Sequence, residues 1–135
     1  MMKLHFYLIV LILFFATGAC DFNDIRLSVK NNSNHAIVFV TSLDTNIQYS
    51  NNIEYYIDNK ILPGEIGNKT QRGSTNAWSL SIRRSKNKKL NVFIISVDTL
   101  TKYNNWENIV TRKLYKRYEF TEEDLDRKNW IIEYP

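Results

Sequence analysis

Cys20 is the only cysteine in this chain of 135 residues, and it divides the sequence into two parts. Ahead of it lie a positive charge at Lys3, an almost wholly apolar run of 13 residues over 4–16, and a few small residues. This order is typical of a secretory signal peptide. The run is also too short for a membrane-spanning helix, which needs about 20 apolar residues. We therefore expect residues 1–19 to be a signal peptide and the remainder to be the part that folds.

The cysteine follows directly on the small residues Thr17, Gly18 and Ala19. This arrangement resembles a bacterial lipobox, in which the cysteine after the cleavage site carries the lipid. It predicts lipidation of Cys20 by palmitate-type acyl chains and a lipidated tether over residues 20–24. Two acyl chains anchor a protein stably where one is marginal. We therefore expect a membrane partner and a place in the cell envelope, with the outer membrane favoured over the inner.

The part after the signal is long enough for one domain and too short for two. It has 116 residues (135 less 19), and removal of Lys3 leaves 17 Lys and Arg against 14 Asp and Glu, a formal charge of +3. So small an excess gives no reason to expect nucleic acid as a partner. Without a second cysteine no disulfide can form within the chain. A hydrophobic core alone must therefore hold a single domain over residues 25–135.

Most of this domain shows the two-residue period of β-strands. We expect strands over residues 25–30, 36–40, 53–57, 78–82, 90–97, 114–120 and 130–134. The basic segment 83–89 separates two of them, which predicts a long β-hairpin over residues 78–97 with a charged tip. The side chains of Trp78, Trp106 and Trp130 lie on apolar faces of their elements, so we expect all three in the core.

The period changes after Val97, where apolar residues recur at three- and four-residue spacing over 100–110. This spacing predicts a short helix, with Asp98 or Thr99 as its cap. A second short helix is expected to open at Thr121, because an acid three residues later completes a capping box. Many short strands with one or two short helices near the C-terminus favour a mainly β fold. The expected architecture is a single Ig-like two-layer β-sandwich.

Four motifs in the last third of the chain follow one another in a distinctive order. They are W-x-x-I at 106–109, K-R-Y at 116–118, T-x-x-D-L at 121–125 and N-W-x-x-x-Y-P at 129–135. With the I-L-P-G turn at 61–64, they resemble a family of small cell-envelope lipoproteins of Bacteroides-like bacteria. Lys128 departs from the pattern, which expects an apolar residue there. The resemblance implies an envelope lipoprotein and supports the sandwich, but it implies no activity and no catalytic residue.

Residues suited to catalysis or metal binding are few. His35 is the only histidine after the signal, and no cysteine and no evident acid partner stand near it in the sequence. A nucleophile needs a base within hydrogen-bond reach, so this pattern argues against an enzyme. One histidine and one lipidated cysteine do not make a zinc site, and the acids at 122–126 lack the spacing of a calcium loop. We expect no catalytic residue, no metal and no cofactor.

Residues suited to binding are easier to find. Tyr49, Tyr55 and Tyr56 border irregular sequence and are the candidates for contact with a ligand. The irregular segment 58–76 is the loop region in which we expect a functional surface, since binding sites concentrate on loops. The basic segment 83–89 could meet an anionic lipid surface, although charge also keeps a hairpin tip soluble. Thr99, within Asp98-Thr99-Leu100, resembles the O-glycosylation site of exported proteins in Bacteroides-like bacteria.

These observations predict a lipid-anchored cell-envelope protein that acts as a binding or structural module without catalysis. The alternative is an accessory carbohydrate-binding module of a surface glycan system. The sequence does not identify a ligand or a protein partner.

Overall fold

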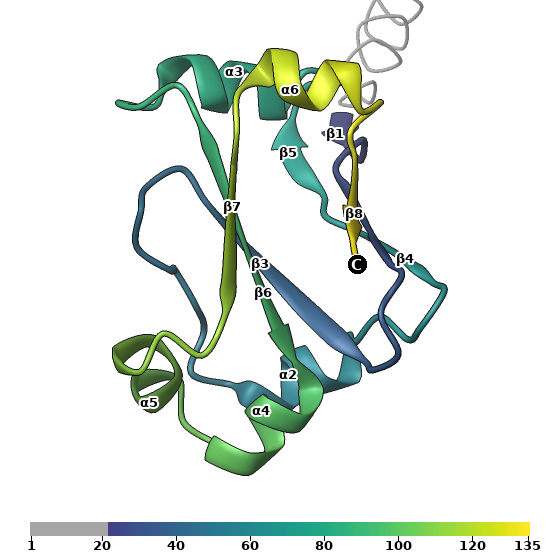
Figure 1. Ribbon diagram of the computed structural model, residues 1–135. Coiled ribbons are helices and arrows are strands. Elements are labelled where there is room, and N and C mark those ends of the chain that lie inside the picture. Colours follow the sequence, from purple (N-terminus) through teal and green to yellow (C-terminus); the bar gives the residue numbers. More distant parts are fainter. Residues whose placement is uncertain (1–21) are drawn as a thin grey trace, which may run out of the picture.

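The computed structural model describes residues 22–135, which form eight strands and five short helices (Figure 1). The strands are β1 (Phe22–Asp24), β2 (Ser28–Asn31), β3 (Ile37–Ser42), β4 (Ile66–Asn68), β5 (Gln71–Gly73), β6 (Leu90–Ser96), β7 (Lys116–Phe120) and β8 (Ile131–Tyr134). The helices are α2 (Ile53–Asp58), α3 (Ala77–Arg84), α4 (Val97–Tyr103), α5 (Trp106–Thr111) and α6 (Glu122–Arg127). The expected signal peptide and Cys20 lie outside the described residues.

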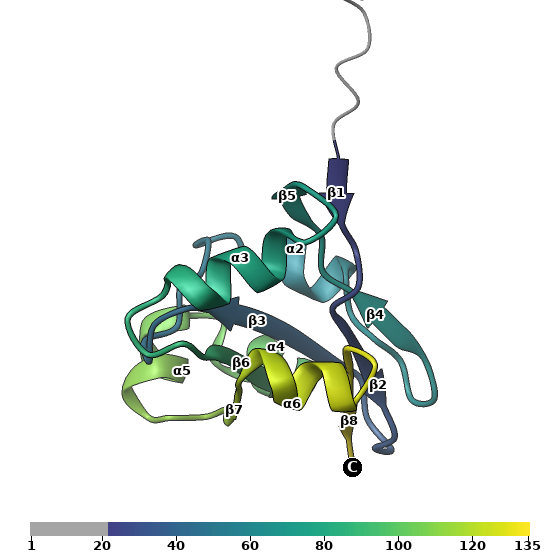
Figure 2. The ribbon, with the colours of Figure 1, turned by 90° about the horizontal axis from the view of Figure 1, so that it is seen from above.

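The strands pair into three small sheets. β6 lies between β3 and β7 and is antiparallel to both. In the second sheet β2 lies between β4, which is antiparallel to it, and β8, which is parallel. The third sheet is the short antiparallel pair of β1 and β5, which lie side by side where the described chain begins (Figure 2).

The main core lies between the two three-stranded sheets. Apolar side chains of β2 and β8 meet those of β3, β6 and β7, and Trp78 and Ile82 of α3 and Leu125 of α6 close one end. A second core lies on the other face of the β3–β6–β7 sheet, where α2, α4 and α5 cover it around Phe93 and Trp106. Strand β6 is buried on both faces, as its continuous apolar sequence predicts.

Residues 53–57 were expected to form a strand, and that prediction is wrong: they belong to α2. The Asn52 side chain accepts a hydrogen bond from the Tyr55 backbone N–H and so caps the helix. Ile53 is buried, and the partly buried Tyr56 and Ile57 follow three and four residues later, on the same helical face. Five residues of mixed apolar sequence do not distinguish the two periods.

The expected hairpin over residues 78–97 is also wrong, because its first half is α3. Trp78 and Ile82, four residues apart, are buried on one helical face, whereas Leu80 between them is 39% exposed. The basic segment 83–89 therefore covers the end of α3 and the turn into β6, and it is not the tip of a hairpin.

The C-terminal region agrees more closely with the sequence. Thr121 and Asp124 form the predicted capping box at the start of α6. The backbone N–H and the hydroxyl of Thr121, together with Arg127, lower the pKa of the Asp124 carboxyl to about 2. The single helix expected over 100–110 is two helices, broken at Asn104 in the left-handed conformation, and the first is capped by Ser96. All three tryptophans are buried, as predicted.

Candidate functional site

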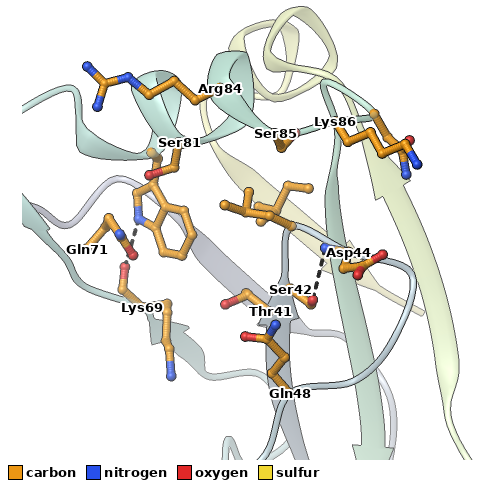
Figure 3. Close-up of a pocket in the computed structure, with 14 residues that line it drawn as sticks. Thr41, Ser42, Asp44, Gln48, Lys69, Gln71, Ser81, Arg84, Ser85 and Lys86 are labelled. Atoms are coloured by element: carbon orange, nitrogen blue, oxygen red, sulfur yellow. Dashed lines mark hydrogen bonds between the residues drawn. The ribbon is translucent and has the colours of Figure 1, made fainter.

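A cleft of about 620 Å³ opens between α3, the end of β3 and the loop after β3 (Figure 3). We call it the α3 cleft. Its size is within the usual range for small-molecule sites. Its lining comes from three separate parts of the sequence: Thr41, Ser42, Leu43, Asp44 and Gln48; Lys69 and Gln71; and Trp78, Ser81, Arg84, Ser85, Lys86, Asn87 and Leu90.

One wall of the cleft is α3, and a residue far away in the sequence fixes where this helix begins. Asn76 occupies the N-cap position but makes no side-chain cap hydrogen bond. Asp24 of β1 takes that role: its Oδ2 accepts a hydrogen bond of 3.0 Å from the Trp78 backbone N–H. The Trp78 indole Nε1 donates to the Lys69 carbonyl oxygen at 3.3 Å. These two bonds hold the tryptophan at the cleft wall.

The Asp24 carboxylate has no exposed side-chain surface and forms an ion pair with Arg26. Arg26 Nε and Nη2 donate to it at 2.9 and 2.8 Å. Burial alone would raise the pKa of Asp24, but hydrogen bonds from Arg26 and from the Trp78 backbone outweigh it, so the pKa is lowered. The carboxylate stays ionised and provides a fixed negative charge at the start of α3.

The lining of the cleft is polar, with an excess of positive charge. The lining contains three cations, Lys69, Arg84 and Lys86, and one carboxylate, Asp44. In Figure 3 the Arg84 side chain projects outward from the top of the cleft and Lys86 lies on the opposite side. Hydroxyl and amide side chains and the Trp78 side chain complete the lining. Such a lining can bind an anionic, hydroxyl-bearing ligand.

The wall opposite α3 is the loop after β3, which is shaped by a local hydrogen bond. The Ser42 Oγ accepts from the Asp44 backbone N–H at 3.0 Å, so the chain turns at the end of the strand and presents Asp44 and Gln48 to the opening (Figure 3). Serine and aspartate commonly make such local turns.

The basic segment 83–89 divides between two roles. Arg84 and Lys86 line the α3 cleft. Arg83 is instead paired with Glu122 at 2.6 Å, and Lys89 with Glu119 at 3.3 Å. Carboxylates thus neutralise part of the charge of this segment.

The three candidate tyrosines lie elsewhere, around Trp106. The Tyr49 ring stacks on the Trp106 ring with 5.0 Å between centroids, and Tyr56 meets the same ring edge-on at 4.8 Å. Tyr55 packs edge-on against Tyr56 and is 53% exposed. None of the three lines the α3 cleft.

The other candidate residues are also separate from the cleft. The partly buried Thr99 has its hydroxyl 2.8 Å from that of Ser96, the residue that caps α4. His35 Nδ1 lies 2.9 Å from the Asn34 side-chain oxygen, and its ring meets Tyr134 edge-on. Among residues 22–135 no three His, Cys, Asp or Glu side chains gather closely enough to hold a metal ion.

The segment 58–76, predicted to carry the functional surface, contributes Lys69 and Gln71 to the cleft. The sequence reasoning missed the contributions of 41–48 and of α3. The cluster of positive charge at 83–89 was the one signal that pointed to this region. Nothing local indicated that the end of β3 would face it.

Comparisons of this chain with protein-family models, with curated proteins and with solved structures find no match. None of the helices within residues 22–135 combines the length and the apolar character that a membrane crossing requires.

Proposed function

We propose that this protein is a lipid-anchored, non-catalytic binding module of the cell envelope, whose α3 cleft takes an anionic ligand. The observation that carries the proposal is the lining of the cleft, which combines three cations with several hydroxyl and amide groups and the Trp78 side chain. A ligand with a carboxylate or phosphate group and neighbouring hydroxyls matches this chemistry, as an acidic sugar does.

The proposed cleft is already built before a ligand arrives. Asp24 caps α3, the Lys69 carbonyl holds the Trp78 indole, and Ser42 shapes the loop opposite. Side chains held in place in advance lose less freedom on binding, which favours affinity. Arg84 and Lys86 are exposed at the rim, where positive charge also speeds the approach of an anion.

Replacing both rim cations should weaken anion binding. The double variant Arg84→Gln/Lys86→Gln is expected to lower the affinity for trigalacturonate, a trisaccharide with three carboxylates, by about tenfold or more, equivalent to at least about 1.4 kcal/mol. The measurement is an NMR titration of the full-length chain in detergent micelles, followed through the Trp78 indole N–H signal.

The matched control is Lys102→Gln/Lys113→Gln, which removes the same charge from residues that do not line the cleft. It should leave the affinity within about twofold of the wild type, apart from the weak long-range effect of net charge. Equal losses in both double variants, or no saturable shift of the Trp78 signal with trigalacturonate, would argue against an anion site in this cleft.

The anchoring part of the proposal is tested separately. Cys20→Ser should remove the protein from the membrane fraction or leave it with an uncleaved signal, because the acyl chains supply the stable attachment. Mass spectrometry of the wild type should show the lipid on Cys20. A wild type without lipid, with unchanged fractionation of the variant, would refute anchoring and leave the cleft proposal untouched.

The second candidate function is an accessory carbohydrate-binding module of a surface glycan system. The observation in its favour is the aromatic cluster of Tyr49, Tyr55, Tyr56 and Trp106, of which Tyr49 and Tyr55 are exposed. Aromatic rings bind the apolar faces of sugars, so this cluster supports a glycan ligand independently of the α3 cleft.

An Ig-like two-layer sandwich remains our proposal for the finer classification of the fold. Its support is the core shared by the two three-stranded sheets. Membership of the lipoprotein family of Bacteroides-like bacteria likewise stays a proposal that rests on the C-terminal motifs.

A further inference from the structure

We infer that a second cleft, beside the aromatic cluster, binds one neutral pyranose unit of a glycan. This inference rests on the second candidate function and assigns it a site. The cleft has a volume of about 550 Å³, and we call it the Tyr49 cleft. Its lining includes Tyr49, Asn51, Asn104, Asn105, Trp106 and Glu107.

The Tyr49 ring supplies a flat stacking surface. It lies nearly parallel to the Trp106 ring, with an interplanar angle of 15°, so the tryptophan supports one of its faces. Tyr49 remains 37% exposed. The C–H groups on one face of a pyranose are slightly positive and are attracted to the negative face of such a ring.

A hydrogen bond holds this surface in place. The Tyr56 hydroxyl oxygen accepts from the Ser50 backbone N–H at 2.9 Å, which ties the loop that carries Tyr49 to α2. Tyr56 also packs edge-on against Trp106. The loop and the helix therefore fix the same indole from two sides, and the stacking surface is preorganised.

Planar polar groups line the rest of the cleft. The side chains of Asn51, Asn104 and Glu107 make no hydrogen bond or ion pair with any other part of residues 22–135. Each amide offers donors and an acceptor, and the carboxylate accepts two hydrogen bonds or more. Adjacent sugar hydroxyls both donate and accept, so this set suits a neutral sugar. The only charged side chain in the lining is acidic, which disfavours an anion here.

The indole of Trp106 adds an independent observation. Its Nε1 is buried and has no hydrogen-bond partner in the part of the chain that the structure describes. A buried donor without a partner costs free energy, and this cost lies directly beneath the stacked Tyr49 ring. The stacking surface and the unpartnered donor thus belong to one side-chain pair at the same cleft.

The test is an NMR titration of the full-length chain in a detergent without a sugar headgroup. The probes are maltotriose, cellotriose, mannotriose and tri-N-acetylchitotriose, each added to about 10 mM, a range that detects weak complexes. We expect at least one of them to shift the Trp106 indole N–H signal saturably and to leave the Trp78 signal unchanged. Trigalacturonate, the anionic probe, should shift the Trp78 signal and leave the Trp106 signal unchanged.

Variants then assign the binding to the stacking surface. Tyr49→Ala should lower the affinity for the saccharide about tenfold, whereas Tyr49→Phe should retain most of that affinity. Phe22→Ala is the matched control, because that exposed aromatic residue lies outside the aromatic cluster and does not line the cleft. Absence of a saturable Trp106 shift with all four sugars would overturn the inference, as would equal affinity of wild type and Tyr49→Ala. Neither result affects the Trp78 titration, which tests the anion site in the α3 cleft separately.

Discussion

Replacing Asp24 with alanine should lower the free energy of unfolding by about 3–4 kcal/mol, the effect expected when one member of a buried ion pair is removed. The Asp24 side chain has no exposed surface. It accepts four hydrogen bonds, three from Arg26 and one from the Trp78 backbone N–H. Without it, α3 loses its cap and Arg26 loses its ion-pair partner. Because Arg26 is partly exposed, water compensates for some of the loss, which places the effect toward the lower end of the usual range.

Urea denaturation of wild type and variant, followed by tryptophan fluorescence, measures this difference. Asp58→Ala is the matched control, since Asp58 is exposed at the end of α2 and should change stability by less than about 0.5 kcal/mol. A loss of less than about 1 kcal/mol in Asp24→Ala would show that Asp24 is not the residue that caps α3.

The stabilisation by Asp24 should depend on pH in a direction set by its pKa. Because that pKa is lower in the folded than in the unfolded chain, folding favours the ionised form. The contribution is therefore complete above the unfolded pKa of about 4 and is lost as the pH falls through the lower folded value. The difference in stability between wild type and Asp24→Ala should shrink below pH 4. A difference that grew on acidification would contradict the sign of the shift.

Trp130→Ala should cost about 3–5 kcal/mol, the range for removal of a large aromatic side chain from a core. Trp130 is 4% exposed and belongs to the main core. The Arg26 guanidinium lies 4.1 Å from the centre of its ring, and its indole Nε1 donates to Asp126 at 2.8 Å. The variant loses the packing and both polar contacts together.

The comparison with Trp130→Phe separates these contributions, because phenylalanine keeps an aromatic ring beneath Arg26 but not the donor to Asp126. It should be destabilised by less than the alanine variant. Thermal melts of the two variants show which is less stable. If Trp130→Ala melted within a degree or two of wild type, the side chain would be at the surface and not in the core.

The Asp24 and Trp130 substitutions should not be additive. Both residues contact Arg26, one through its charge and the other through the face of its ring. Residues that share a partner usually show coupling, of about 0.5–3 kcal/mol. A double variant whose loss equals the sum of the single losses would indicate that Arg26 holds the two sites independently.

Elements with strong local signals were predictable from the sequence. The apolar run at 36–40 and the stronger one at 90–97 are β3 and β6, within a residue or two. The Thr121 capping box opens α6, and Ile132 and Tyr134 share the buried face of β8. In each case the signal lies within a few neighbouring residues, so the local sequence is sufficient to specify it.

The errors fall where a short apolar pattern fits two periods. Residues 53–57 and 78–82 fit a strand or a helical turn about equally well, and packing decided between them. α2 forms because Ile53, Tyr56 and Ile57 cover the second core, and α3 because Trp78 and Ile82 close the first. Neither core exists until distant strands have paired, so the deciding interaction is not local.

The sequence alone determined where the single cysteine stands, that no second cysteine is available for a disulfide, and which residues are apolar enough to be core. Tertiary structure decided the two candidate sites. Asp24 reaches Trp78 across 54 positions, and the α3 cleft takes its lining from three separate segments. Tyr49 meets Trp106 only because α5 and the loop before α2 cover the same sheet. The partners of a side chain across a fold depend on how the helices and strands pack, and local sequence spacing does not predict that packing.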